Sequence, residues 1–140
     1  WTLIDRFYVY GNALSGTLPT EIGAWTSIRG FQVFNSAVSG TLPTEIGAWA
    51  VIQDIKVCNN ALSGMLPTEM ALWTTLHELN ILNNRLTGAI PAITAVSQRC
   101  HLSLTNAPFG NMFDCPTPTA LSATCTAWAP AITRPCGGTD

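Results

Sequence analysis

The stretch Ser39–Trp49, SGTLPTEIGAW, decides the fold of this chain, because it also occurs letter for letter at Ser15–Trp25. A third copy, SGMLPTEMALW, stands at Ser63–Trp73, so the period is 24 residues. The same period spaces three kinds of residue: Trp1, Trp25, Trp49 and Trp73; Pro19, Pro43, Pro67 and Pro91; Gly16, Gly40, Gly64 and Gly88. A fixed period of about 20 to 50 residues is typical of a solenoid, whose units bury their apolar faces against one another.

The composition fits one domain with an apolar core, and it argues against a transmembrane helix and against nucleic-acid binding. The 140 residues are 47% hydrophobic and 10% charged, and no apolar run approaches the roughly 20 residues of a transmembrane helix. We therefore expect a membrane to be involved only through an anchor outside this piece. Six basic residues, of which one is lysine, stand against eight acidic ones. No basic stripe is available to neutralise phosphates, which argues against nucleic acid.

The repeats divide the chain. Residues 1–12 match the second half of a unit, so we expect either a processed piece or further repeats before it. Three full units follow, at Asn12–Asn35, Ser36–Asn59 and Asn60–Asn83, and a degenerate unit begins at Asn84. We predict repeats over residues 1–106 and a C-terminal cap with a Thr- and Pro-rich tail over residues 107–140.

Each unit contains a short alternating segment that predicts a half-buried strand. The residues expected to point inward are Phe31 and Val33, Ile55 and Val57, Leu79 and Ile81. Stacked units place these strands in one parallel sheet. After each strand comes a small polar residue that we expect to satisfy backbone groups as a structural ladder. Its members are Asn12, Ser36, Asn60 and Asn84, of which the serine is the weakest.

The segment LPTEIGAW then returns the chain along the outer side. Its proline sets φ for the start of a helical or 3₁₀ turn. Ile22, Ile46 and Met70, together with the tryptophans, supply a second apolar wall. We expect the four period-marking indoles to pile one above the next.

These letters resemble a known family. The pattern WxxIxxFxVxxxxVSGxLPxxIG in Trp25–Gly47 is similar to the 24-residue plant-type leucine-rich repeat, LxxLxxLxLxxNxLSGxIPxxLG. SGTLPTEIGAW also resembles the repeats of kinetoplastid surface antigens, in which SGTLP recurs. The resemblance covers about residues 1–106. Tryptophan at the first apolar position and Ser36 in place of asparagine depart from the pattern.

The resemblance implies an α/β solenoid that is mostly β and loop. It is a right-handed coil with a parallel β-sheet on the concave face and short 3₁₀ or helical turns on the convex face. The family usually binds partners on the concave face without catalysis, in an extracellular or cell-surface setting. It needs no cofactor.

Four cysteines follow the repeats: Cys100, Cys115, Cys125 and Cys136. Their spacings do not resemble the C-x-x-C pairs of zinc or redox sites, so we expect disulfides and an oxidising compartment. Three pairings are possible, and the sequence does not choose among them. A disulfide-tied segment here resembles the C-terminal caps of extracellular leucine-rich repeat proteins. The Thr- and Pro-rich composition of residues 116–135 would suit O-linked glycans.

The outward strand residues form a grid that we predict to bind ligand. The flanking row is Arg6, Gly30, Asp54 and Glu78; the central row is Tyr8, Gln32, Lys56 and Asn80; the apolar row is Tyr10, Phe34, Cys58 and Leu82. An apolar row rimmed by charges favours a protein or glycan contact. The alternative is that these side chains only pack against one another.

The fifth cysteine, Cys58, has two interpretations. It is either a free thiol acting as a small hydrophobe between Phe34 and Leu82 or half of an intermolecular disulfide.

Few other residues indicate chemistry. Glu21, Glu45 and Glu69 form a like-charged row, which we expect to be solvated and not to bind a metal; the accompanying Thr20, Thr44 and Thr68 are possible O-glycan acceptors. His77 and His101 pair with no nucleophile, and no phosphate-binding glycine loop or H-E-x-x-H motif occurs, so we predict no enzyme.

Two functions follow from the sequence. The first is an extracellular recognition or adhesion module that binds a protein or glycan. The second is a structural subunit that self-associates end to end into a coat or filament, because a solenoid with an open apolar edge can stack on another chain.

Overall fold

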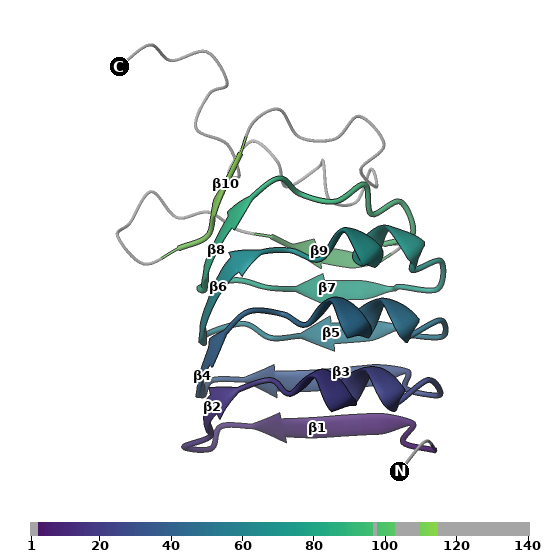
Figure 1. Cartoon of the computed structure of the whole chain (residues 1–140), viewed down its shortest axis with the longest axis horizontal. Coiled ribbons are helices and arrows are strands. Elements are labelled where there is room, and N and C mark those ends of the chain that lie inside the picture. Colours follow the sequence, from purple (N-terminus) through teal and green to yellow (C-terminus); the bar gives the residue numbers. More distant parts are fainter. Residues whose placement is uncertain (1–2, 97, 103–109, 115–140) are drawn as a thin grey trace.

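Two parallel sheets form the body of the protein. A computed structural model describes residues 3–96, 98–102 and 110–114. The first sheet has the strand order β1 (Arg6–Tyr10), β3 (Gly30–Phe34), β5 (Asp54–Lys56), β7 (Glu78–Asn80) and β9 (Arg99–His101). The second has the order β10 (Met112–Phe113), β8 (Arg85–Gly88), β6 (Ala61–Met65), β4 (Ala37–Gly40) and β2 (Ser15–Thr17). Each coil contributes one strand to each sheet (Figure 1).

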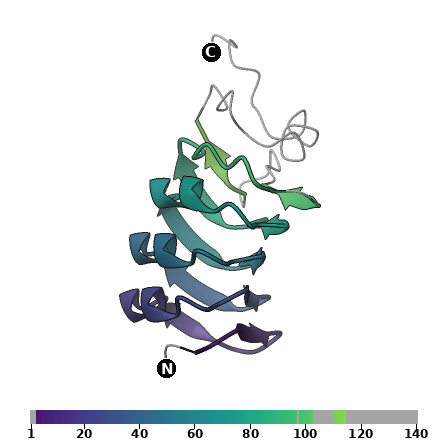
Figure 2. The same ribbon diagram turned by 90° about the vertical axis from the view of Figure 1, so that its right-hand side faces the viewer.

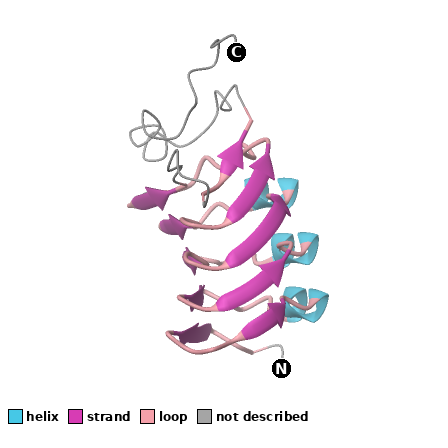
Figure 3. Cartoon of the chain, turned by 90° about the vertical axis from the view of Figure 1, so that its left-hand side faces the viewer, coloured by secondary structure: helices cyan, strands magenta, loops and turns pink. Residues whose placement is uncertain are grey.

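Three 3₁₀ turns lie opposite the first sheet. They are η1 (Thr20–Ala24), η2 (Thr44–Ala48) and η3 (Thr68–Leu72). Figures 2 and 3 show the coils stacked as successive layers, with these turns on one side and the first sheet on the other. Pro19 and Pro43 precede η1 and η2 with φ of -76° and -65°, which is the range that the pyrrolidine ring imposes. The expected solenoid, with its parallel sheet and short 3₁₀ turns, is confirmed.

The strand residues alternate as predicted. Phe31 and Val33 of β3 are buried, as are Ile55 of β5 and Leu79 of β7. The parallel register places Phe7, Phe31 and Ile55 side by side on neighbouring strands. The inner face of the first sheet is therefore a continuous apolar wall, and its outer face carries the residues between.

The sequence did not predict the second sheet. Its strands lie in and around the glycine-containing segments such as SGTL, which look like turns in the sequence. In the structure Gly16, Gly40, Gly64 and Gly88 have positive φ. A side chain at Gly40 would also meet the methyl group of Thr17, at 2.8 Å, and one at Gly64 would meet that of Thr41, at 2.9 Å. The glycines thus serve a close strand contact as well as a bend.

A second glycine position lets the 3₁₀ turns stack. A Cβ added at Gly23 in η1 would lie 2.5 Å from the Cβ of Glu45 in η2, and one at Gly47 would meet Glu69 in η3 in the same way. The third copy carries Ala71 at this position. No 3₁₀ turn is present over residues 91–96, so the alanine methyl meets no turn of the next coil.

The tryptophans pack along the interior only in part as expected. Trp49 and Trp73 are 1% exposed, and their rings stack with centroids 6.5 Å apart at 9°. Trp25 is half-buried and pairs with Phe7, at 5.1 Å, and with Phe31. Phe31 in turn lies 5.0 Å from Trp49, so an aromatic ring from the sheet separates Trp25 from the indole pair. Trp1 lies outside the described residues.

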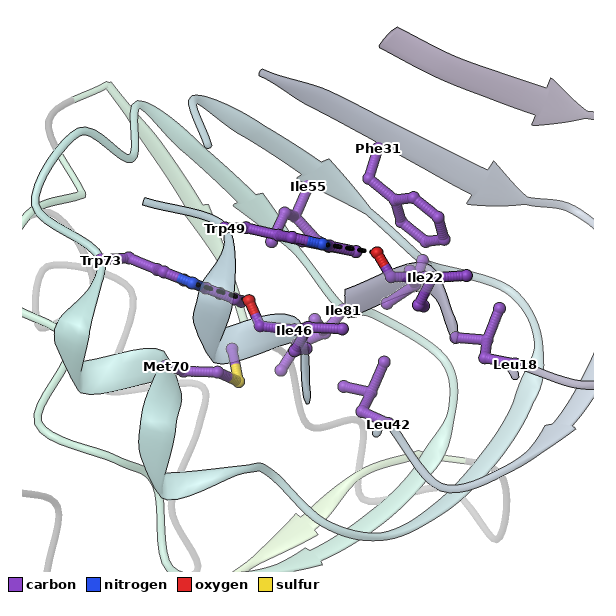
Figure 4. Close-up of a pocket in the computed structure, with 11 residues that line it drawn as sticks. Leu18, Ile22, Phe31, Leu42, Ile46, Trp49, Ile55, Met70, Trp73 and Ile81 are labelled. Atoms are coloured by element: carbon purple, nitrogen blue, oxygen red, sulfur yellow. Dashed lines mark hydrogen bonds between the residues drawn. The ribbon is translucent and has the colours of Figure 1, made fainter. Parts of the chain in front are cut away.

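Both buried indoles are held by the preceding coil. Trp49 Nε1 donates a hydrogen bond to the Ile22 carbonyl at 3.0 Å, and Trp73 Nε1 donates to the Ile46 carbonyl at 3.3 Å (Figure 4). A buried indole N–H needs such a partner. The carbonyls belong to η1 and η2, which explains how tryptophan occupies a position where the repeat pattern has leucine.

Replacement of Trp49 by alanine is expected to lower the free energy of unfolding by about 3 to 5 kcal/mol, because it leaves a large cavity in a close-packed interior. The measurement is urea denaturation followed by far-ultraviolet circular dichroism. Trp25→Ala is the matched control and should cost less, since this indole is half-buried. Equal losses for the two variants would contradict the burial difference.

Candidate ligand-binding face

The outward residues of the first sheet stand in register across the coils. In the flanking row the partners are Arg6, Gly30, Asp54, Glu78 and Arg99; in the central row they are Tyr8, Gln32, Lys56 and Asn80. Arg99 extends the flanking row by one strand, which the sequence analysis missed because the unit that supplies it is degenerate. We call this surface the first-sheet face.

The apolar row begins with a pair of stacked rings. Tyr10 and Phe34 are register partners whose centroids lie 4.6 Å apart at 6°. Tyr10 is 53% exposed, whereas Phe34 is half-buried. The row continues to Cys58 and Leu82 through backbone bonds from the next residues, Asn35 N to Cys58 O and Asn59 N to Leu82 O. Exposed apolar surface is therefore concentrated at the β1 end.

Cys58 does not belong to that exposed surface. It is 8% exposed and is a free thiol. Its burial, the largest cause, raises the pKa of the thiol above its ordinary value; its own backbone and the nearby Lys56 act in the opposite direction. A buried neutral thiol is a poor nucleophile, so the structure favours the packing interpretation over an intermolecular disulfide.

One ion pair on the face is well shielded. Lys56 Nζ lies 3.2 Å from Glu78 Oε2, and the two side chains are 26% and 15% exposed. By contrast, Asp5 lies 3.4 Å from Arg29 and 3.6 Å from Arg6 with all three side chains more than half exposed. Exposed pairs of this kind contribute little because water screens them.

Asparagine side chains fix the edge of the face. Asn60 Nδ2 donates to the carbonyls of Val33, Val57 and Cys58, at 2.8, 3.1 and 3.3 Å, and its Oδ1 accepts from Val38 N. Asn84 repeats this pattern one coil later, with donors and acceptors from Leu62, Val57, Ile81 and Leu82.

The ladder has a member that the sequence analysis missed and weak members at its start. Asn111 accepts from Leu86 N and donates to Ile81 O and Leu102 O. It stands 27 residues after Asn84, outside the 24-residue period. Asn12 is exposed and, within the described part of the chain, donates only to Tyr10 O; there the Ser36 hydroxyl donates only to Phe34 O.

A second, exposed asparagine row runs beside the first. Asn35, Asn59 and Asn83 have φ of 52°, 54° and 50°, a left-handed conformation that asparagine tolerates. Asn59 Nδ2 donates to Asn35 Oδ1 at 2.6 Å, and Asn83 Nδ2 donates to Asn59 Oδ1 at 2.7 Å. Asn59 and Asn83, together with Asn60, Asn84 and Arg85, line an open hollow of ≈ 450 Å³.

The interior offers no ligand cavity of useful size in the described part of the chain. The apolar void between the two walls, shown in Figure 4, has a volume of ≈ 10 Å³. Its lining includes Leu18, Leu42 and Ile81 (Figure 4). Such a space holds at most about one water molecule.

The other candidate residues lie apart from the first-sheet face. The hydroxyls of Thr20, Thr44 and Thr68 donate to the carboxylates of Glu21, Glu45 and Glu69, at 3.4, 3.4 and 3.3 Å, on the 3₁₀ side. No group of three or more metal-binding side chains occurs among the residues that the structure describes. The same residues contain no helix long and apolar enough to span a membrane.

The cap predictions lie largely outside the described residues. Cys100 is buried and disulfide-bonded, whereas Cys115, Cys125 and Cys136 are not described. The disulfide-tied cap and the boundary at residue 106 stay predictions. The second sheet does continue past residue 106, to β10.

Comparison with solved structures identifies the architecture. The ectodomain of the Arabidopsis receptor kinase HAESA, in complex with an IDA peptide hormone, superposes with a TM-score of 0.71 at 27% identity, over 84% of this chain and 20% of that one. The ectodomain of the Arabidopsis thaliana receptor kinase SOBIR1 gives 0.70 at 20% identity, over 80% and 60%. A plant ice-binding protein gives 0.67 at 22% identity, over 79% and 35%.

These matches differ in function and share a fold. The chain spans less than two thirds of the length of each of the three solved chains. No protein-family model and no curated protein sequence matches it. The similarity therefore establishes a plant-type leucine-rich repeat solenoid.

Replacement of Asn84 by alanine is expected to lower the free energy of unfolding by about 3 kcal/mol or more, because it leaves buried backbone groups without partners. The converse change, Ser36→Asn, should raise it by about 1 kcal/mol by supplying the missing amide. Urea denaturation measures both. If Ser36→Asn proves as destabilising as Asn84→Ala, the amide is not what holds this position.

The Cys58 thiol is expected to react with a disulfide reagent at about pH 8 only after the protein unfolds, because burial keeps it protonated. Its raised pKa also gives the sign of a pH effect. The contribution of the buried, neutral thiol to the free energy of unfolding is complete below the ordinary thiol pKa of 9.0. It is lost as the pH rises above that value, because the thiol of the unfolded chain ionises first. Cys58→Ser should remove this decline; rapid labelling of the folded protein would contradict the burial.

Proposed function

We propose that this chain, a leucine-rich repeat protein of the plant type, is a non-catalytic extracellular or cell-surface recognition module that binds a protein ligand on the first-sheet face. The observation that carries the proposal is the chemistry of that face. Exposed Tyr8 and Tyr10 lie on β1, on the same sheet as the shielded Lys56–Glu78 pair of β5 and β7. Exposed aromatic rings combined with partly desolvated charges on one surface are typical of the residues that dominate protein interfaces.

The proposed site combines the predicted rows across the sheet. Tyr10 supplies a ring that is already ordered by stacking on Phe34, so little rotamer entropy is lost when a ligand covers it. Gln32 and Asn80 flank Lys56 in register and offer amide donors and acceptors. Leu82 closes the apolar row at its far end.

The structural neighbours support a protein ligand and an extracellular setting. HAESA is an ectodomain whose structure contains a peptide hormone. The resemblance of the SGTLP phrase to kinetoplastid surface antigens also fits a cell surface. A glycan ligand belongs to the proposal as the alternative class, because the exposed asparagine row offers amide donors and acceptors of the kind that bind hydroxyl groups.

A second candidate is end-to-end self-association, and the first coil favours it. Leu3 is 87% exposed and Leu14 is 39% exposed. Exposed apolar side chains of this kind can be covered by a second copy of the chain.

Tyr10→Ala is expected to weaken binding of a protein ligand by about tenfold or more, because it removes an exposed aromatic anchor. The folded state should keep its stability, since Tyr10 is 53% exposed. Partners are captured from extracellular fluid by the purified chain, identified, and then measured by calorimetry with each variant. Thr44→Ala, on the 3₁₀ side, is the matched control.

Unchanged affinity of Tyr10→Ala would contradict binding at this face, and loss of folding would mean that the ring is part of the core. Sedimentation of the purified chain separates the second candidate. Ordered polymers formed without added ligand would favour self-association, whereas a monomer at micromolar concentration would argue against it.

A further inference from the structure

A notch in the flanking row lies next to the proposed anchor. Arg6, Asp54 and Glu78 fill this row on their strands, but β3 has Gly30 there. The Tyr8 side chain occupies the space: a Cβ added at Gly30 would lie 2.8 Å from Tyr8 Cε1 and 3.0 Å from Cζ. Tyr8 therefore leaves its own row and lies over the backbone of β3, with 41% of its surface exposed.

The next residue in that row carries an unused negative charge. Asp54 is the register partner of Gly30, so its Cβ stands about 4.8 Å from the position that the Tyr8 phenol covers. The side chain is half-buried. Within the part of the chain that the structure describes, it forms no ion pair and no hydrogen bond.

The neighbouring charges do not neutralise it. Glu78 follows Asp54 in register, and two carboxylates side by side on a sheet repel each other. Lys56 pairs with Glu78. Arg6 lies with its Nε 3.6 Å from Asp5. One carboxylate thus stays unpaired in the middle of the first-sheet face, beside an aromatic ring.

From this geometry we infer that Asp54 and Tyr8 together form a receptor for an arginine side chain of the protein ligand. The inference rests on the proposed function and names the ligand group that the face selects. A guanidinium is planar: it can stack on the Tyr8 ring while its paired N–H groups bond both oxygens of the Asp54 carboxylate. An ammonium group can attract both the ring and the carboxylate, but it has neither the flat surface nor the paired N–H groups.

The site also explains why Gly30 breaks the row. With a side chain at position 30, Tyr8 would have to rise off the sheet, and its ring would no longer lie next to Asp54. Gly30 is thus a positioning residue for Tyr8. Arginine would contribute both a charge for Asp54 and a flat surface for the ring, next to the Tyr10–Phe34 pair that anchors the rest of the ligand.

The test uses a displayed library of random peptides selected on the intact chain and read by sequencing. Peptides that bind wild type and are lost on Tyr10→Ala should be enriched in arginine at one position. In the best such peptide, replacement of arginine by citrulline, which removes the charge and keeps the shape, should weaken binding by about tenfold or more. On Asp54→Asn the same replacement should have little effect.

Two matched comparisons assign the roles. Glu21→Gln removes an exposed carboxylate from the 3₁₀ side and should leave arginine selection intact. Tyr8→Phe keeps the ring and should retain binding, whereas Tyr8→Leu should lose it. Selection of Tyr10-dependent peptides without arginine would overturn this inference while leaving the proposed function in place. A library that yields no Tyr10-dependent binder would overturn both.

Discussion

Polar groups in the interior of each coil are satisfied by the backbone of the coil before it. Trp49 Nε1 reaches Ile22 O, and Asn60 Nδ2 reaches Val33 O; both bonds span 27 residues. A buried N–H without a partner would cost more than an ordinary hydrogen bond contributes. The solenoid therefore depends on a register that matches coil to coil, and a shift by one residue would break the indole and amide bonds together.

The same register brings the outward residues of different coils together into one continuous surface. Tyr8, Gln32 and Lys56 are far apart in the chain and become neighbours because Phe7, Phe31 and Ile55 are held opposite one another inside. The interior can stay nearly identical from unit to unit while the outside varies freely. Gly30 against Asp54, and Tyr10 against Cys58, show how far equivalent positions have diverged on one rigid frame.

The period predicted most of this frame, since residues 24 apart must be equivalent in a stack of coils. The inward strand residues, the 3₁₀ turns after the prolines and the rows of the first-sheet face all follow from it. The second sheet did not, because each of its first four strands contains a glycine, which has low strand propensity, and these strands form through contacts between coils. Asn111 was missed since it lies outside the period. The depth of Cys58 and the tilt of Tyr8 toward Gly30 depend on three-dimensional packing that no spacing reveals.

Ala71 limits how this architecture can grow. Gly23 and Gly47 each allow a glutamate of the following 3₁₀ turn to approach closely. A unit with glycine at this position of its turn therefore accepts another unit of the same kind behind it. The third copy, which has Ala71 at this position, does not, because the alanine methyl group would collide with the glutamate of an added 3₁₀ turn. A further unit of the same kind therefore fits behind Gly23 or Gly47, whereas one placed directly after Trp73 would need glycine in place of Ala71.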